Sequence, residues 1–286
     1  SGIDHIDSDY LKKHQIALFD AKGCNAAAVA DYVIATLACL YIKNKVLGSK
    51  AGVIGVGEVG SRVVARLRAI GFDVICFDPI KEKKDKSFPY CSLADLATCD
   101  VICVHANLHH TIPYPSFNLL DADFLATLKP GTVIINAARG GIVNELALLN
   151  QATPLTYCTD VYSGEPDIDA NTVAFSTLCT PHIAGHTIEA KTTAVMTICQ
   201  QIHEFYGVSM PAISQPLLEK PSLTPYEDWK NCVLSLYNPL DDTGPLKAAF
   251  DKKFAFLTQR QAHQRHDFAV YDTQQLYQCM KALLGQ

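Results

Sequence analysis

Three side chains of this 286-residue chain have the types and positions needed for proton transfer on a small organic acid. Arg139, Glu165 and His182 each lie at the end of a predicted strand or in the loop that follows it. A guanidinium can hold a carboxylate through two parallel hydrogen bonds. An imidazole can take the proton of a hydroxyl group while a hydride leaves the same carbon, and a neighbouring carboxylate favours its protonated form. We therefore predict Arg139, Glu165 and His182 as catalytic residues.

Each of these residues also has an ordinary explanation when it is taken alone. Arg139 could belong to a surface ion pair, Glu165 to a turn, and His182 to a core site where the backbone satisfies the imidazole. The catalytic interpretation gains its weight from the combination of three complementary roles with a nucleotide-binding motif earlier in the chain.

That motif is Gly-Val-Gly-Glu-Val-Gly at residues 55–60, between an apolar strand at 51–56 and a helix at 57–69. In a G-x-G-x-x-G turn the first glycine permits the tight turn. The second lets a pyrophosphate approach the backbone, and the third lets the helix pack closely on the strand. The N-terminus of the helix then faces the phosphates.

Asp78 ends the next predicted strand and stands 18 residues after Gly60. An acid at this place accepts hydrogen bonds from the adenosine ribose and repels a 2′-phosphate, which favours NAD over NADP. The alternative is a tight turn followed by an unrelated aspartate. The lysine-rich stretch 81–86 could grip a 2′-phosphate, but its interspersed acids favour a solvated loop.

Short strands and helices alternate through the middle of the chain. Apolar runs predict strands at 51–56, 73–77, 101–105, 132–135 and 155–161, with helices at 57–69, 92–98, 121–128 and 144–149. This alternation predicts an α/β fold, a Rossmann-type doubly wound parallel sheet. Ligands of such sheets bind at the carboxyl ends of the strands, where the predicted catalytic residues lie.

The flanking segments divide the chain into three predicted domains: 1–25, 26–207 and 208–286. Helical spacing predicts a helix after Asn25 and a second one between Thr187 and Gly207, with Val195, Ile198, Ile202 and Phe205 on a buried face. Beyond Met210 prolines recur and polar residues become dense, which indicates a small α+β appendage.

Composition limits the possible partners. The chain is 49% hydrophobic and 19% charged, and its net charge of −5 with scattered lysines argues against a nucleic-acid partner. Its 11 cysteines form no C-x-x-C pair and predict free thiols in a reducing compartment. The longest apolar stretch, 26–42, contains Asp31, so we expect a soluble, cytoplasmic protein with no membrane partner. We predict no metal site.

Motifs along most of the chain resemble the D-isomer-specific 2-hydroxyacid dehydrogenase family. They are Gly-Cys-Asn-Ala at 23–26, the glycine turn, Leu-Lys-Pro-Gly at 128–131, Asn-Ala-Ala-Arg-Gly at 136–140, Asp-Val at 160–161, Glu-Pro at 165–166 and Pro-His-Ile-Ala-Gly at 181–185. The resemblance implies oxidation of a 2-hydroxy acid with NAD, and it places Arg139, Glu165 and His182 at the family's catalytic positions. The implied cofactor-binding residues are Gly55, Gly57, Glu58, Val59, Gly60, Asp78, Ala106, Ala137, Ala138, Arg139, Asp160 and Gly185.

The assignments of Asp160 and Ala106 are less direct than the others. Asp160 could accept from the nicotinamide amide, or it could have a structural role. Ala106 stands where a small hydroxyl residue near the cofactor is common in the family.

Within the family, segments 1–7, 23–26 and 182–191 and the tail 237–265 resemble a branch that oxidises a phosphorylated acid on a route to pyridoxal phosphate. The resemblance implies a homodimer held by the C-terminal domain, and substrate contacts from Arg139, His182 and His186. That branch usually has tyrosine where this chain has His186. Two alternatives are open: oxidation of another acid such as 3-phosphoglycerate or glycerate, and an inactive NAD-binding protein.

The family begins with further βα units of a flavodoxin-like substrate domain. We expect residues 1–25 to be the end of that domain, and the chain to be a fragment that lacks part of the site for the substrate phosphate.

Overall fold

The computed structural model describes residues 2–211, 223, 228–271 and 278–286. At its centre is a six-stranded sheet in the order β2-β1-β3-β4-β5-β6, in which every neighbouring pair is parallel. The strands are β1 (Lys50–Ile54), β2 (Asp73–Phe77), β3 (Val101–Val104), β4 (Val133–Asn136), β5 (Thr156–Thr159) and β6 (Leu178–Cys179). The predicted Rossmann-type parallel sheet is confirmed.

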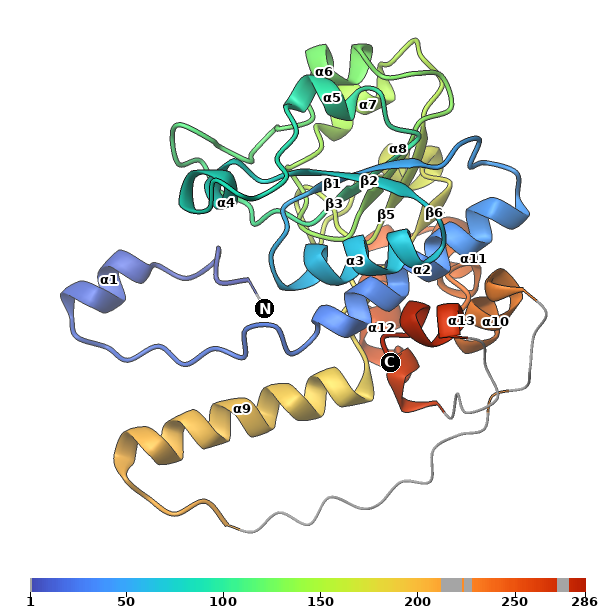
Figure 1. The fold of residues 1–286 in the computed structure, drawn as a ribbon. Coiled ribbons are helices and arrows are strands. Elements are labelled where there is room, and N and C mark those ends of the chain that lie inside the picture. Colours follow the sequence, from blue (N-terminus) through green and yellow to red (C-terminus); the bar gives the residue numbers. More distant parts are fainter. Residues whose placement is uncertain (1, 212–222, 224–227, 272–277) are drawn as a thin grey trace.

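Helices cover both faces of the sheet, as Figure 1 shows. On one face lie α2 (Ala26–Ile42) and α3 (Glu58–Ala69), and on the other α5 (Leu93–Leu96), α6 (Ala122–Ala126) and α7 (Glu145–Leu149). Successive side chains of a strand point to opposite faces. Val101 and Cys103 of β3 therefore belong to the first core, and Ile102 and Val104 to the second.

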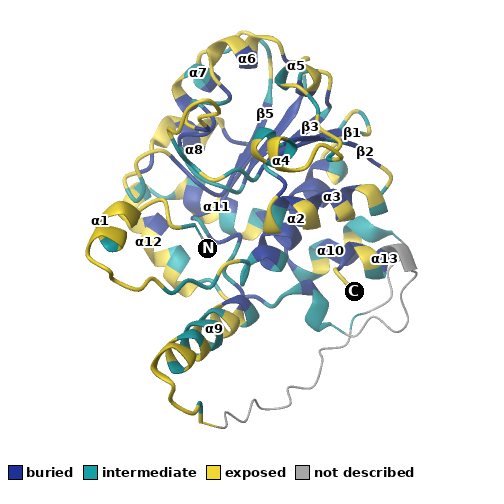
Figure 2. Ribbon diagram, turned by 60° about the vertical axis from the view of Figure 1, so that its left-hand side comes forward, coloured by how far each residue is buried: buried dark blue, intermediate teal, exposed yellow. Residues whose placement is uncertain are grey.

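The helix α2 is buried over nearly its whole length, because it lies between the sheet and the C-terminal helices (Figure 2). Its one acid, Asp31, is fully buried and pairs with Arg66 of α3. In the part of the chain that the structure describes, no helix has the length and apolar character needed to cross a membrane.

The C-terminal part consists of α10 (Trp229–Leu236), α11 (Leu240–Ala248), α12 (Lys252–Ala262), a 3₁₀ turn at Phe268–Val270 and α13 (Gln278–Leu283). It packs on α2, α3 and β6. Within the described residues beyond 207 every regular element is helical, so the α+β character predicted there is not found. The apolar residues 268–270 form a single 3₁₀ turn, and the N–H of Phe268 donates to Asp31 at 2.8 Å.

Two other expectations need correction. Thr187 and Gly207 do cap a long helix, α9 (Ile188–Tyr206), but its apolar face is largely exposed, and Phe205 is 60% exposed. In Figure 1 this helix extends away from the sheet. Near its far end, the ring of Phe205 lies 5.4 Å from that of Phe19, and Nε2 of Gln201 donates to the carbonyl of Asp20 at 2.9 Å. The apolar residues 16–19 suggest a short strand by sequence, but residues 2–25 contain one short helix, α1 (Ser8–Lys13), and add no strand to the sheet.

Candidate functional site

The glycine turn has the geometry that a dinucleotide requires. Gly55 has φ +81°, and a Cβ there would lie 2.6 Å from the nitrogen of Ala106. A Cβ on Gly60 would lie 2.0 Å from the carbonyl oxygen of Gly55, so this glycine permits the close packing of α3 on the turn. Gly57 has nothing within 4 Å on its Cβ side, which leaves open space beside the start of α3.

The N-terminus of α3 is suited to an anion. Glu58 and Val59 are its first residues, and its N-cap is Gly57, which has no side chain to accept from the first-turn N–H groups. Such groups, together with the helix dipole, attract phosphate. The turn therefore fits the pyrophosphate of a dinucleotide.

Asp78 lies directly beside this turn. One carboxylate oxygen accepts from the N–H of Val56 at 2.9 Å, and the other accepts from the N–H of Lys81 at 2.9 Å, which caps α4 (Pro79–Lys84). The lysine-rich stretch thus begins as a helix and not as a loop. Asp78 braces the glycine turn, and the ribose contact predicted for it stays a prediction.

Glu165 and His182 form the central pair of the candidate site. The Nδ1 atom of His182 lies 2.7 Å from Oε2 of Glu165, and Oε1 of Glu165 accepts from the N–H of Tyr162 at 2.8 Å. His182 has φ +56°, a left-handed conformation that a non-glycine residue keeps only where its surroundings enforce it. With Nδ1 engaged, Nε2 is the nitrogen that can exchange a proton with a ligand.

Asp160 holds the segment that carries His182. Its carboxylate accepts from Thr180 Oγ1 at 2.7 Å and from the N–H groups of Ile183 and Ala184 at 2.7 and 2.8 Å. The side chain is 1% exposed. Burial raises the pKa of Asp160 to about 6, while His182 acts in the opposite direction. This geometry supports the structural alternative, in which Asp160 positions His182.

Arg139 lies at the end of β4, in a turn that Asn136 holds. The Asn136 amide accepts from the N–H of Ala138 at 3.1 Å and donates to the carbonyl of Arg139 at 3.0 Å. Ala137 lies between them. The next residue, Gly140, packs on the 162–165 loop, because a Cβ there would lie 2.0 Å from the carbonyl oxygen of Tyr162.

The guanidinium of Arg139 contacts a different carboxylate from the one in the central pair. Its Nε donates to Oδ1 of Asp4 at 3.1 Å. The structure therefore joins Glu165 and His182 directly, and links Arg139 to them through the backbone contact of Gly140. In this structure the guanidinium is therefore occupied by a carboxylate of the chain itself.

Gly185 and His186 complete the segment. A Cβ on Gly185 would lie 2.4 Å from Nδ2 of Asn25, so glycine is needed where this segment meets the start of α2. His186 is half-buried, and its N–H donates to the carbonyl of Ile183 at 2.8 Å. Its side chain faces a cavity that Lys191 and Arg260 also line.

Sequence patterns missed two titratable groups near the site. His105 follows β3 beside the glycine turn, and both of its ring nitrogens are buried with no partner among the described residues. Burial lowers the pKa of His105 to about 3, so the imidazole is neutral. The other group is Glu145, the first residue of α7, whose Oε1 accepts from the N–H of Ser163 at 2.9 Å. The sequence signal that could have identified Glu145 is its position directly after Asn144, the N-cap of α7.

Glu145 gives a prediction for stability against pH. Burial raises its pKa from 4.5 to about 7, and Glu165 acts in the same direction. Between pH 4.5 and about pH 7, Glu145 keeps its proton in the folded chain but has lost it in the unfolded chain. The free energy of unfolding therefore falls as pH rises through this range. Glu145→Gln removes this effect and still accepts from Ser163. We expect the variant to be about 2–3 kcal/mol more stable than the wild type at pH 8, and equal to it at pH 4.5. Urea unfolding at both pH values tests this, and a difference independent of pH would contradict it.

Comparisons with known proteins agree with the geometry. The family described as "D-isomer specific 2-hydroxyacid dehydrogenase, NAD binding domain" matches residues 36–184. Erythronate-4-phosphate dehydrogenase of Legionella pneumophila strain Philadelphia 1 is 51% identical over 273 residues, which are 95% of this chain and 77% of that protein. The enzyme of the same name from Coxiella burnetii strain RSA 493 is 41% identical over 73% of this chain and 57% of its own length.

A solved structure is also similar. The NAD-dependent formate dehydrogenase of Staphylococcus aureus, in complex with NAD, superposes with a TM-score of 0.61 and 25% identity over 72% of this chain and 70% of that one. The sheet order, the glycine turn and these matches lead to one conclusion: the chain belongs to the D-isomer specific 2-hydroxyacid dehydrogenase family, with its NAD-binding domain at the centre.

Proposed function

We propose that the chain catalyses oxidation of 4-phospho-D-erythronate to 3-hydroxy-2-oxo-4-phosphooxybutanoate with NAD, in the synthesis of pyridoxal phosphate. The observation that carries the proposal is the 2.7 Å contact of Glu165 with His182, at the edge of the sheet that also holds the glycine turn. The names of the relatives support this substrate.

The cofactor fits the residues present. The open side of Gly57 and the uncapped start of α3 suit the pyrophosphate, and Asp78 stands beside the turn. NAD, when bound, supplies the acceptor for the hydride that leaves the hydroxyl-bearing carbon. The contacts of the cofactor with Ala106, Ala137, Ala138, Asp160 and Gly185 are part of the proposal.

The residues of the chain supply the remaining steps. His182 takes the hydroxyl proton at Nε2, and Glu165 stabilises the imidazolium that forms. Arg139 exchanges Asp4 for the carboxylate of the substrate and sets its orientation. The tightly held 180–184 segment keeps the imidazole in place, so that little reorganisation is needed during the reaction.

Initial rates on three acids test the substrate. With NAD present, 4-phospho-D-erythronate should be oxidised with a higher kcat/KM than 3-phosphoglycerate or glycerate. A preference for glycerate or 3-phosphoglycerate would assign the chain to another reaction within the family.

One contact favours a second candidate, an NAD-binding protein without turnover. Asp4 holds the guanidinium that the substrate carboxylate needs. Asp4→Asn separates the two: a rise in kcat/KM shows that Asp4 competes with substrate in a working enzyme, whereas binding of NAD with no oxidation in either form supports the second candidate.

A homodimer is also proposed. Exposed phenylalanines at the start of α12 support it, since Phe250 and Phe254 are 105% and 67% exposed. Sedimentation of the wild type and of Phe254→Glu tests this assembly: the wild type should sediment as a dimer and the variant as a monomer. A cytoplasmic location stays a prediction.

A pair of glycine variants tests the cofactor site. Gly57→Ala places a methyl group in the open space of the turn, so we expect NAD affinity to fall at least about tenfold with no change in thermal stability. Gly60→Ala forces a methyl group against the Gly55 carbonyl, and overpacking of this kind costs about 1–3 kcal/mol. Calorimetric titration with NAD and thermal unfolding measure both effects. Unchanged NAD affinity in Gly57→Ala would move the pyrophosphate away from this turn.

A further inference from the structure

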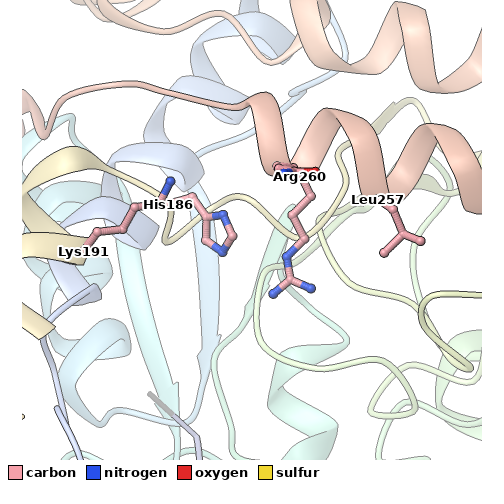
Figure 3. A pocket seen from close by; sticks show the side chains of 5 residues that line it. His186, Lys191, Leu257 and Arg260 are labelled. Carbon is pink, nitrogen blue, oxygen red and sulfur yellow. The ribbon is translucent and has the colours of Figure 1, made fainter. Parts of the chain in front are cut away.

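A cavity of about 580 Å³, open to solvent and with Lys191 exposed at its side, lies between the first turn of α9 and the helix α12, on the chain segment that follows His182. Figure 3 shows the imidazole of His186 and the guanidinium of Arg260 entering the same space, with Lys191 beside His186. Its lining residues are His186, Lys191, Leu257, Arg260 and Gln261. The glycine turn and the Glu165–His182 pair contribute nothing to this lining.

The cavity carries positive charge with no counter-ion. Within the described ranges, neither the ammonium of Lys191 nor the guanidinium of Arg260 has a hydrogen bond or ion pair, and no carboxylate lines the space. Glu189, on the same turn as Lys191, is engaged elsewhere: it lies 2.7 Å from Nδ1 of His266 and accepts from the N–H of Asp267 at 2.9 Å. Two cations facing one cavity repel each other, and an anion between them would relieve that repulsion.

His186 adds a polar group that lacks a partner. Its Nδ1 is buried and has no hydrogen bond to any described residue. Burial lowers the pKa of His186 to about 4, and Arg260, Lys191, His182 and His263 act in the same direction. The imidazole is therefore neutral at pH 7 and can donate one N–H. The other ring nitrogen, Nε2, is not enclosed in this way and is the one that a ligand in the cavity can reach.

We propose that Lys191, Arg260 and His186 form the subsite that holds the phosphate group of the substrate, while Arg139 and His182 meet its carboxylate and hydroxyl groups. This inference rests on the proposed function. A guanidinium can bind two phosphate oxygens in its plane, and an ammonium adds a point charge.

The placement of the subsite follows from one short segment. His186 stands four residues after His182, and the hydrogen bond from its N–H to the carbonyl of Ile183 closes a tight turn directly after His182. A substrate whose hydroxyl group meets His182 therefore has its far end near the cavity. Because Arg260 belongs to α12, preference for a phosphorylated acid depends on a helix outside the NAD-binding domain.

Kinetics on two substrates test the subsite. Arg260→Gln and a control on the same helix, Lys253→Gln, are compared on 4-phospho-D-erythronate and on unphosphorylated D-erythronate. The control ammonium pairs with Asp167 at 2.9 Å and does not line the cavity. In Arg260→Gln the ratio of the two kcat/KM values should fall about 10–100-fold, mainly through KM, as expected for loss of a charge-assisted hydrogen bond. An unchanged ratio in Arg260→Gln, or an equal fall in the control, would overturn the inference.

A binding measurement without turnover separates this inference from the proposed function. Inorganic phosphate is added to the wild-type chain while the ring protons of His186 are followed by NMR, with His186→Gln for assignment. Phosphate should raise the pKa of His186, because it neutralises Lys191 and Arg260, and the rise should be smaller in Lys191→Gln and Arg260→Gln. If phosphate leaves His186 unmoved, the subsite is wrong. If phosphate moves His186 but neither acid is oxidised, the subsite stands and the proposed function fails.

Discussion

His182→Asn is expected to lower kcat by about 10²–10⁴-fold, the usual contribution of a general base, while NAD affinity stays unchanged. The imidazole acts on the hydroxyl proton and has no part in the glycine turn that receives the nucleotide. Asparagine suits the comparison because it tolerates the left-handed backbone that His182 adopts, φ +56°. Single-turnover rates and calorimetric titration with NAD separate the two effects.

Glu165→Gln is the matched variant for the same pair. A glutamine oxygen can still accept from the N–H of Tyr162, so the loop keeps its shape. The amide cannot stabilise an imidazolium, and the acidic limb of the pH profile of kcat/KM should shift. Unchanged turnover in His182→Asn would remove His182 from the mechanism, and an unchanged profile in Glu165→Gln would remove the electrostatic role of the carboxylate.

The second large effect concerns stability and centres on Asp31. This carboxylate is fully buried in α2, pairs with Arg66 of α3 and accepts from the N–H of Phe268 at 2.8 Å. It therefore joins two helices of the sheet domain to the C-terminal part. Asp31→Ala leaves the Arg66 cation buried without a partner, which costs about 3–5 kcal/mol. Urea unfolding followed by circular dichroism measures the loss.

Three further variants make this result interpretable. Asp31→Asn keeps an acceptor for Phe268 and should lose less stability. Asp31→Leu combined with Arg66→Met removes both charges and should recover most of the loss, since apolar replacement of a buried pair is often neutral. Glu82→Ala breaks the exposed Glu82–Lys86 pair and should cost about 0–1 kcal/mol. A loss in Asp31→Ala no larger than that of Glu82→Ala would mean that the buried pair has no special weight.

The helix α2 that carries Asp31 also contacts the candidate site. Tyr32, the residue after Asp31, is hydrogen-bonded through its hydroxyl group to Thr180 at 2.8 Å, and Thr180 donates to Asp160. The position of His182 thus depends on a helix that lies far from it in the sequence. Loss of the Asp31 pair should lower activity as well as stability.

Local patterns were sufficient for five of the six strands of the sheet, and they missed the two-residue strand β6. Short apolar runs separated by helical segments predict the parallel strands, because a strand covered on both faces needs apolar side chains on both. The glycine spacing at 55–60 predicts the turn, since a tight turn and a close helix contact exclude a Cβ. The placement of Arg139 and Glu165 after strands followed from the same order, because parallel strands bring their carboxyl ends to one edge. His182 follows β6, which only the structure revealed.

Partners of buried polar groups required the folded chain. From the sequence, Asp160 could contact the nicotinamide or have a structural role. Three groups of the 180–184 segment donate to its carboxylate, and only these contacts favour the positioning role. Glu145 looks like a surface acid at the start of a helix until packing buries it, and the apolar stretch around Asp31 predicts a buried helix but not the arginine that pairs with this acid. The apolar face of α9 was expected to be buried and is exposed. Helical spacing shows which side of a helix is apolar, but it does not show whether another element covers that side.

The charged cavity is the clearest example of a feature that the sequence alone does not predict. Lys191 and Arg260 stand on different helices, and nothing in the residues around either of them predicts the other. Secondary structure depends on neighbours within a few residues, so the sequence alone could predict the sheet, the glycine turn and the types of the reacting groups. A hydrogen bond or a shared cavity depends on the distance between segments after they pack, and only the tertiary structure decided which charges meet.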